Sequence, residues 1–84
     1  MSARVKLPEP LAGLLRSELE LAIKEAALYR DDDLIARRYI IEKWAQIDIA
    51  AELGWERSTV SHHIPHILEE VTRTANRITQ LTHN

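Results

Sequence analysis

Five polar side chains that can bond to nucleic-acid bases or phosphates stand within six residues of the chain. They are Arg57, Ser58, Thr59, Ser61 and His62. An arginine guanidinium can donate two hydrogen bonds to a guanine edge, and hydroxyl groups can bond to bases or phosphates. An imidazole can donate to a guanine or to a phosphate. These residue types predict a surface that contacts DNA.

The residues before this group have the spacing of a helix-turn-helix. Aliphatic side chains first recur at helical steps, at Ile47, Ala50, Ala51 and Leu53. Gly54 then offers a residue that adopts positive φ at no steric cost, as the turn requires. Ala50 lies where two crossing helices leave no room for a larger side chain, and Val60 should point the second helix back onto the first. We therefore expect Ala50 to be buried at a helix crossing.

The motif as a whole is predicted to span about 46–64. Its first helix should cover 46–53, its turn 54–56, and its recognition helix should begin at Arg57. We expect Trp55 to pack beneath the turn. A helical hairpin that binds nothing would have the same spacing, so the spacing alone leaves that alternative open.

An extended arm and two helices are expected before the motif. Pro8 and Pro10 keep the residues before them out of helical geometry, so residues 1–10 should form the arm. A helix is expected over 11–28, because apolar residues recur there at three- and four-residue steps: Leu11, Leu14, Leu15, Leu19, Ala22, Ile23 and Ala26. Asp31 to Asp33 should cap a second helix, over 34–44.

Pro65 should kink or break the recognition helix near 62–64, because proline removes one helical hydrogen bond and crowds the preceding turn. A last helix should then cover 65–81. These elements predict an all-α fold, a compact bundle of about five helices, with residues 11–84 forming a single helix-turn-helix domain.

Composition excludes several classes of protein. The 84-residue chain has no cysteine, which excludes disulfides and thiolate zinc ligands and fits a cytoplasmic protein. No apolar run approaches the roughly 18–20 residues that span a bilayer, and no signal-peptide apolar region is apparent, so we expect no membrane association. The chain also lacks a phosphate-cradling glycine loop, and we expect neither enzymatic activity nor a cofactor.

The net charge is less positive than is usual for a protein that binds DNA. The net charge is −2, and residues 31–55 carry three basic and six acidic groups. Because phosphate neutralisation supplies much of the affinity for DNA, this predicts weak non-specific binding and a need for dimerisation or a partner protein.

The run ARRYIIEKWAQIDIAAELGWERSTVSHHI resembles the fourth region of bacterial primary sigma factors. It is similar also to the short sigma-like helix-turn-helix regulators of phages and prophages of Gram-positive bacteria. The resemblance implies a sequence-specific transcriptional regulator of double-stranded DNA, with a recognition helix in the major groove. It makes the five polar residues from Arg57 to His62 the base-facing ones, and it leaves RNA polymerase open as a partner.

The chain departs from that family's pattern at three positions. His62 and His63 stand where the family more often has arginine or another long donor, and Pro65 is unusual inside a recognition helix. His62 and His66 have the four-residue spacing of a zinc pair, but Pro65 lies between them, so we expect no metal site. Because of these departures, the affinity for DNA and the target sequence should differ from those typical of the family.

We expect the protein to be a homodimer when it binds DNA, because one recognition helix offers few readable side chains. Half-sites should then lie about 34 Å apart, or a multiple of that. The favoured interface is the first helix, through Leu11, Leu14, Leu15 and Leu19, ahead of the last helix, through Val71 and Ile78. The alternative function is a protein-interaction module that binds RNA polymerase or another regulator without reading DNA.

Overall fold

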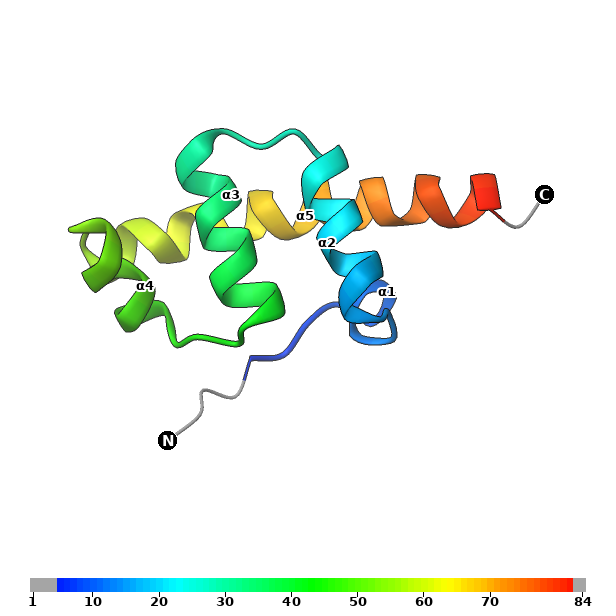
Figure 1. The fold of residues 1–84 in the computed structure, drawn as a ribbon. Coiled ribbons are helices and arrows are strands. Elements are labelled where there is room, and N and C mark those ends of the chain that lie inside the picture. Colours follow the sequence, from blue (N-terminus) through cyan, green and yellow to red (C-terminus); the bar gives the residue numbers. More distant parts are fainter. Residues whose placement is uncertain (1–4, 83–84) are drawn as a thin grey trace.

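The computed structural model describes the backbone of residues 5–82 and the side chains of residues 5–80, and it shows an all-α fold (Figure 1). Its helices are α1 (Glu9–Ala12), α2 (Arg16–Glu25), α3 (Arg30–Ala36), α4 (Gln46–Leu53) and α5 (Arg57–Thr82). A π-helical turn, η1 (Arg37–Ile41), continues α3. The predicted bundle of about five helices is confirmed. None of the helices within residues 5–82 combines the length and apolarity that a bilayer crossing demands.

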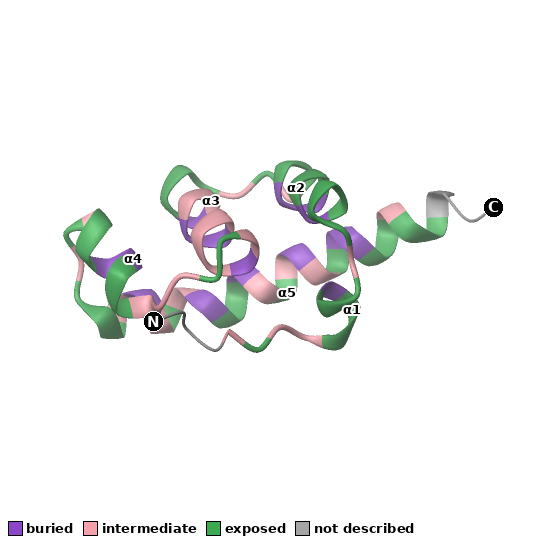
Figure 2. Cartoon of the chain, turned by 60° about the horizontal axis from the view of Figure 1, so that its bottom comes forward, coloured by how far each residue is buried: buried purple, intermediate pink, exposed green. Residues whose placement is uncertain are grey.

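The longest helix, α5, is the axis of the molecule. Its 26 residues rise about 39 Å at the standard 1.5 Å per residue, close to the longest dimension of 43 Å. Helices α2 and α3 pack across it, and α4 packs at its N-terminal end (Figure 1). In Figure 2 the buried segments of α5 alternate with exposed ones. The buried residues recur every three or four positions: Val60, Ile64, Ile67, Val71 and Ala75.

Each of the other elements contributes aliphatic side chains that cover this stripe. The largest of them are at most 7% exposed: Leu11, Leu19, Ile23, Ile35, Ile40 and Ile49. Burying one such side chain stabilises the fold by about 1.5–3 kcal/mol before chain entropy is counted. A single core therefore joins α5, from Val60 to Ala75, to the rest of the chain.

The prediction of one helix over 11–28 is wrong, because the chain breaks it after α1. Helix α1 ends at Gly13, and α2 begins after Leu15, whose backbone N–H donates to the Glu18 carboxylate at 2.8 Å. The break lets Leu11 and Leu19 both reach the core. Helix α2 also ends before residue 28, in a turn where Ala27 has φ 52°.

The second helix begins at Arg30, not near Leu34, and it runs into η1, which ends at Ile41. Its N-cap is Tyr29, and no side chain makes a capping hydrogen bond there. The predicted cap by Asp31 to Asp33 is therefore wrong, although all three carboxylates lie in the first turn, where the helix dipole favours them. Asp32 and Asp33 bond instead to side chains of α5 and η1, which compete with the backbone for these carboxylates.

The predicted break near Pro65 is also wrong, since α5 continues without interruption from Arg57 to Thr82. A proline inside a helix costs about 3 kcal/mol. Here Pro65 is exposed, while Ile64 and Ile67 on either side of it are buried. Their burial, at about 1.5–3 kcal/mol each, is large enough to hold the two parts of the helix in line.

The predicted arm over 1–10 is too long. Residues 5–8 have no regular secondary structure, and Glu9 and Pro10 already belong to α1. Leu7 is half-buried and packs against the core. Residues 1–4 of the predicted arm lie outside the described residues. The segment before α1 is therefore attached to the fold from residue 5 onwards.

Candidate nucleic-acid interface

The junction between α4 and α5 lies at the residues that the sequence predicts for the turn. Helix α4 covers Gln46–Leu53, and α5 begins at Arg57. Gly54 has φ 71° and ψ 29°, the left-handed conformation that only glycine adopts without cost. The backbone N–H of Trp55 donates to the Ala50 carbonyl at 2.9 Å, which closes the end of α4. The direction of α5 relative to α4 is thus set locally.

The packing predicted for this junction is confirmed. Ala50 is 3% exposed and Val60 is fully buried, so α4 and α5 meet through a small side chain and a branched one. Trp55 is half-buried against the same core, as expected for an anchor beneath the turn. The two helices therefore form one rigid unit.

Four of the five predicted site residues share one face of the first turns of α5. At about 100° per residue, Arg57, Ser58, Ser61 and His62 fall within less than half of the helix circumference. Arg57, Ser58 and His62 are exposed, and Ser61 is half-buried beside α4. Pro65 is exposed on the same side. The unit therefore presents a polar face next to the N-terminus of a helix, where anions are favoured.

Ser61 is tied to the first residue of α4. Its hydroxyl donates a hydrogen bond to Oε1 of Gln46. Because a serine hydroxyl has one donor and two lone pairs, Ser61 keeps only acceptor capacity toward a ligand. The Gln46 amide, with its oxygen occupied, presents its NH2 group as a donor. Gln46 thus joins the polar face, a placement that the sequence prediction did not include.

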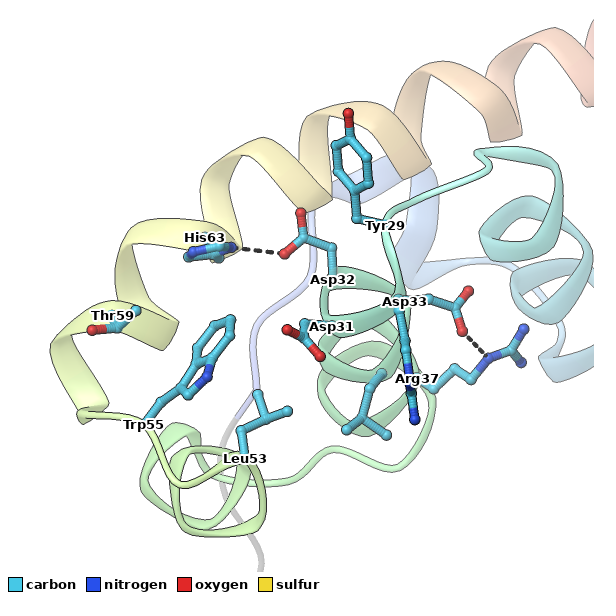
Figure 3. Close-up of a pocket in the computed structure, with 11 residues that line it drawn as sticks. Tyr29, Asp31, Asp32, Asp33, Arg37, Leu53, Trp55, Thr59 and His63 are labelled. Carbon is cyan, nitrogen blue, oxygen red and sulfur yellow. Dashed lines mark hydrogen bonds and ion pairs between the residues drawn. The ribbon is translucent and has the colours of Figure 1, made fainter.

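The fifth predicted residue, Thr59, lies elsewhere. It lines an open hollow of about 960 Å³ between α3 and α5, together with Tyr29, Asp32, Trp55 and His63 (Figure 3). This hollow is on the side of α5 that faces α3. Thr59 therefore faces this hollow, although His62, three residues further along α5, is its neighbour on the helix surface.

His63 has a role that the sequence prediction missed. Its Nδ1 lies 2.7 Å from Oδ1 of Asp32, a residue that is only 8% exposed. Figure 3 shows this bond, which joins α5 to α3. The ring also packs on Trp55, with centroids 5.0 Å apart. On opposite sides of α5, Ser61 and His63 therefore hold the helix to α4 and α3. No local signal pairs them, because 31 residues separate Asp32 from His63.

The arginines nearest this junction are largely neutralised by intramolecular ion pairs. Arg38 lies between Glu42 and Glu52, and hydrogen bonds to Glu52 and then to Glu42 raise its pKa above the ordinary value. Arg37 pairs with Asp33 at 2.9 Å. Arg57, by contrast, forms no ion pair within the described part of the chain. Its guanidinium is therefore open to a ligand at the start of α5.

Lys43 is held by the backbone at the end of η1. Its Nζ donates to the Ile40 carbonyl at 2.7 Å, and desolvation by burial lowers its pKa. His62 and His66, the suggested zinc pair, are both exposed on α5. Within the described residues, three or more histidine, aspartate or glutamate side chains nowhere converge as a metal site would require.

Comparison of the chain with protein-family models, with curated proteins and with solved structures finds no match.

Proposed function

We propose that the protein binds double-stranded DNA sequence-specifically and regulates transcription, with the first turns of α5 in the major groove. The observation that carries the proposal is the exposed face formed by Arg57, Ser58, Ser61 and His62 on a rigid α4–α5 unit. A major groove admits one α-helix, whose N-terminal residues then meet base edges. No catalytic role is proposed.

Each group on this face has a distinct task in the proposal. Arg57, free of an ion pair within the described residues, forks its donors onto a guanine edge. Ser58 and His62 bond to phosphates or bases. Ser61, already donating to Gln46, accepts from an amino group of adenine or cytosine. The Gln46 NH2 group, at the start of α4, donates to a phosphate.

We infer that the DNA-bound form is a homodimer, because one junction supplies a single unpaired arginine. The buried side chains rule out part of the predicted interface: Leu11, Leu19 and Val71 belong to the protomer core. A groove of about 360 Å³ between α2 and α5 remains, lined by Leu14, Leu21 and Ile78. Leu15, the chain neighbour of Leu14, is 68% exposed. An exposed leucine that follows a groove residue suits a two-fold interface, in which one patch meets itself.

The same groove favours the alternative function, a module that binds another protein such as RNA polymerase. In that case Leu14, Leu21 and Ile78 contact the partner, and the polar face of α5 has no DNA ligand. Ion pairing of Arg37 and Arg38 within the chain also fits a domain that does not bind phosphates. The two functions differ in salt dependence: affinity for DNA should fall steeply as the salt concentration rises, whereas binding of a protein through the apolar groove should not.

Selection of duplexes from a random-sequence pool with the purified protein tests the proposal. DNA binding predicts an enriched sequence, an arrangement of half-sites, and an affinity that falls as the salt concentration rises. The protein-interaction function predicts no enriched duplex. In that case sedimentation together with RNA polymerase would show a complex that Leu21→Asp abolishes.

A further inference from the structure

Ile47 is an apolar side chain in an unexpected place. Its periodicity predicts a core position, yet it is 63% exposed, while Ile49 and Ala50 on the other face of α4 are buried. It is one of four large apolar side chains exposed within the described residues. Single exposed apolar residues are common and need no explanation by themselves. The surroundings of Ile47 are what give it a function.

Ile47 borders a second hollow, of about 380 Å³, at the start of α4 and α5. Apolar and polar side chains both line this hollow, and its principal residues are Val5, Tyr39, Trp44, Gln46, Ile47 and Arg57. The guanidinium of Arg38 lies over the Trp44 ring, 4.9 Å from its centroid, and supports that side of the hollow. The exposed Ile47 therefore shares the hollow with two residues that carry donors, Gln46 and Arg57.

This arrangement fits one feature of the major groove. Thymine alone among the four bases presents an apolar group there, the C5 methyl, beside an acceptor oxygen. Phosphates and guanine edges supply acceptors on either side of that methyl group. A hollow that combines an apolar contact with two donor side chains is thus complementary to a thymine beside a guanine or a phosphate.

A protein partner fits the same surface less well. An apolar protein face that covered Ile47 would also cover Arg57, which has no ion-pair partner within the described residues. Burying an unpaired charge is costly. DNA removes that cost, because it brings its own negative charge and acceptors to the guanidinium.

We propose that Ile47 is a specificity-determining residue that contacts the C5 methyl group of a thymine in the DNA bound by α5. This proposal rests on the proposed function. It names one base, and one chemical group of that base, that the protein recognises through α4 rather than through α5.

Uracil substitution isolates that methyl group. In the selected duplex, each thymine is replaced in turn by deoxyuridine, which lacks only the methyl, and affinity is measured by fluorescence anisotropy. One position should lose affinity about three- to fivefold, as expected for one methyl group removed from water. Ile47→Ala should bind the thymine duplex more weakly by a similar factor and should no longer distinguish thymine from uracil at that position.

Tyr29→Ala is the matched control. It also shortens an exposed apolar side chain, 87% exposed, but at the start of α3 and outside the proposed DNA and dimer contacts, so it must keep the difference between the thymine and uracil duplexes. Because both residues are exposed, both variants should keep the wild-type melting temperature.

The outcomes separate this inference from the function on which it rests. If Ile47→Ala still distinguishes thymine from uracil, the inference is overturned and DNA binding stands. It is overturned in the same way if Ile47→Ala changes only the oligomeric state in sedimentation, since a second copy would then cover Ile47. If selection enriches no duplex at all, both the proposed function and this inference are overturned.

Discussion

The two ends of α5 are held in different ways. In the N-terminal segment, residues 57–64, Ser61 bonds to α4 and His63 bonds to α3, so polar contacts with two other helices fix the rotation of the helix. In the C-terminal segment, residues 69–80, Arg73 pairs with Glu69 and Glu70, and the Thr74 hydroxyl donates to the Glu70 carbonyl. These bonds stay within the helix.

Directional hydrogen bonds fix the rotation of a helix about its axis, whereas an apolar stripe determines only which side of the helix is buried. Val71 and Ala75 bury the C-terminal segment against the bundle, and the side chains of Arg73 and Thr74 bond within the helix itself. The difference suits a helix whose first turns must present Arg57 and His62 in a fixed direction. The C-terminal segment then needs only to support the core and the apolar groove beside α2.

Ala50→Leu should have the largest effect, because it forces α4 away from the N-terminal segment. Ala50 is 3% exposed at the contact of α4 with α5. Overpacking there should lower the free energy of unfolding by about 1–3 kcal/mol, which corresponds to a melting temperature lower by several degrees. Calorimetry measures this change in melting temperature. A wild-type melting temperature would mean that the two helices do not pack through this residue.

Asp32→Ala tests the bond that fixes the N-terminal segment to α3. It leaves the His63 ring without its partner and should cost about 1–2 kcal/mol of stability. It should also weaken DNA binding, because α5 becomes free to rotate. Glu69→Ala is the matched control: it removes a carboxylate that pairs with Arg73 on the exposed side of the C-terminal segment, and such pairs contribute about 0.2–1 kcal/mol.

Urea unfolding and anisotropy with the selected duplex compare the two variants. If both lose the same stability and both keep wild-type DNA affinity, the contrast between the two segments is wrong.

Thr72→Val should have the smallest effect. The Thr72 Oγ1 atom is buried and has no hydrogen-bond partner within the described residues. Replacing an unpaired hydroxyl by a methyl group of similar shape should leave stability unchanged or raise it by up to about 1 kcal/mol. Thr74→Val, which removes the bond to the Glu70 carbonyl, should instead lower stability slightly. Loss of stability in Thr72→Val in urea unfolding would show that its hydroxyl is paired.

The sequence predicts the α4–α5 junction well, because its signals are local. Gly54 needs positive φ, Ala50 must be small, and both constraints act within one turn of the residues concerned. The carboxylates of Asp31 to Asp33 show the opposite case. Their residue types favour a cap, but Asp32 bonds to a histidine 31 residues away, and no local pattern contains that partner.

Pro65 and Thr59 show two further limits. Local chemistry predicts a break at Pro65, but burial of Ile64 and Ile67 outweighs the cost of the proline. Thr59 has a suitable side chain for DNA contact, but it lines the hollow that the packing of α3 against α5 creates. Residue type and helical spacing therefore suggest the candidate site residues, whereas the surroundings of each one depend on tertiary packing.

Arg57→Ala is the sharpest test of the proposal that the first turns of α5 read DNA. Arg57 is exposed, so the variant should fold with the wild-type melting temperature. Its affinity for the selected duplex should fall by about 1–3 kcal/mol, or roughly 5- to 150-fold, and discrimination at one base pair should be lost. Arg73→Ala, at the exposed side of the C-terminal segment, should keep both the affinity for the selected duplex and the discrimination at that base pair. Equal affinities of wild type and Arg57→Ala for selected and random duplexes would contradict the account.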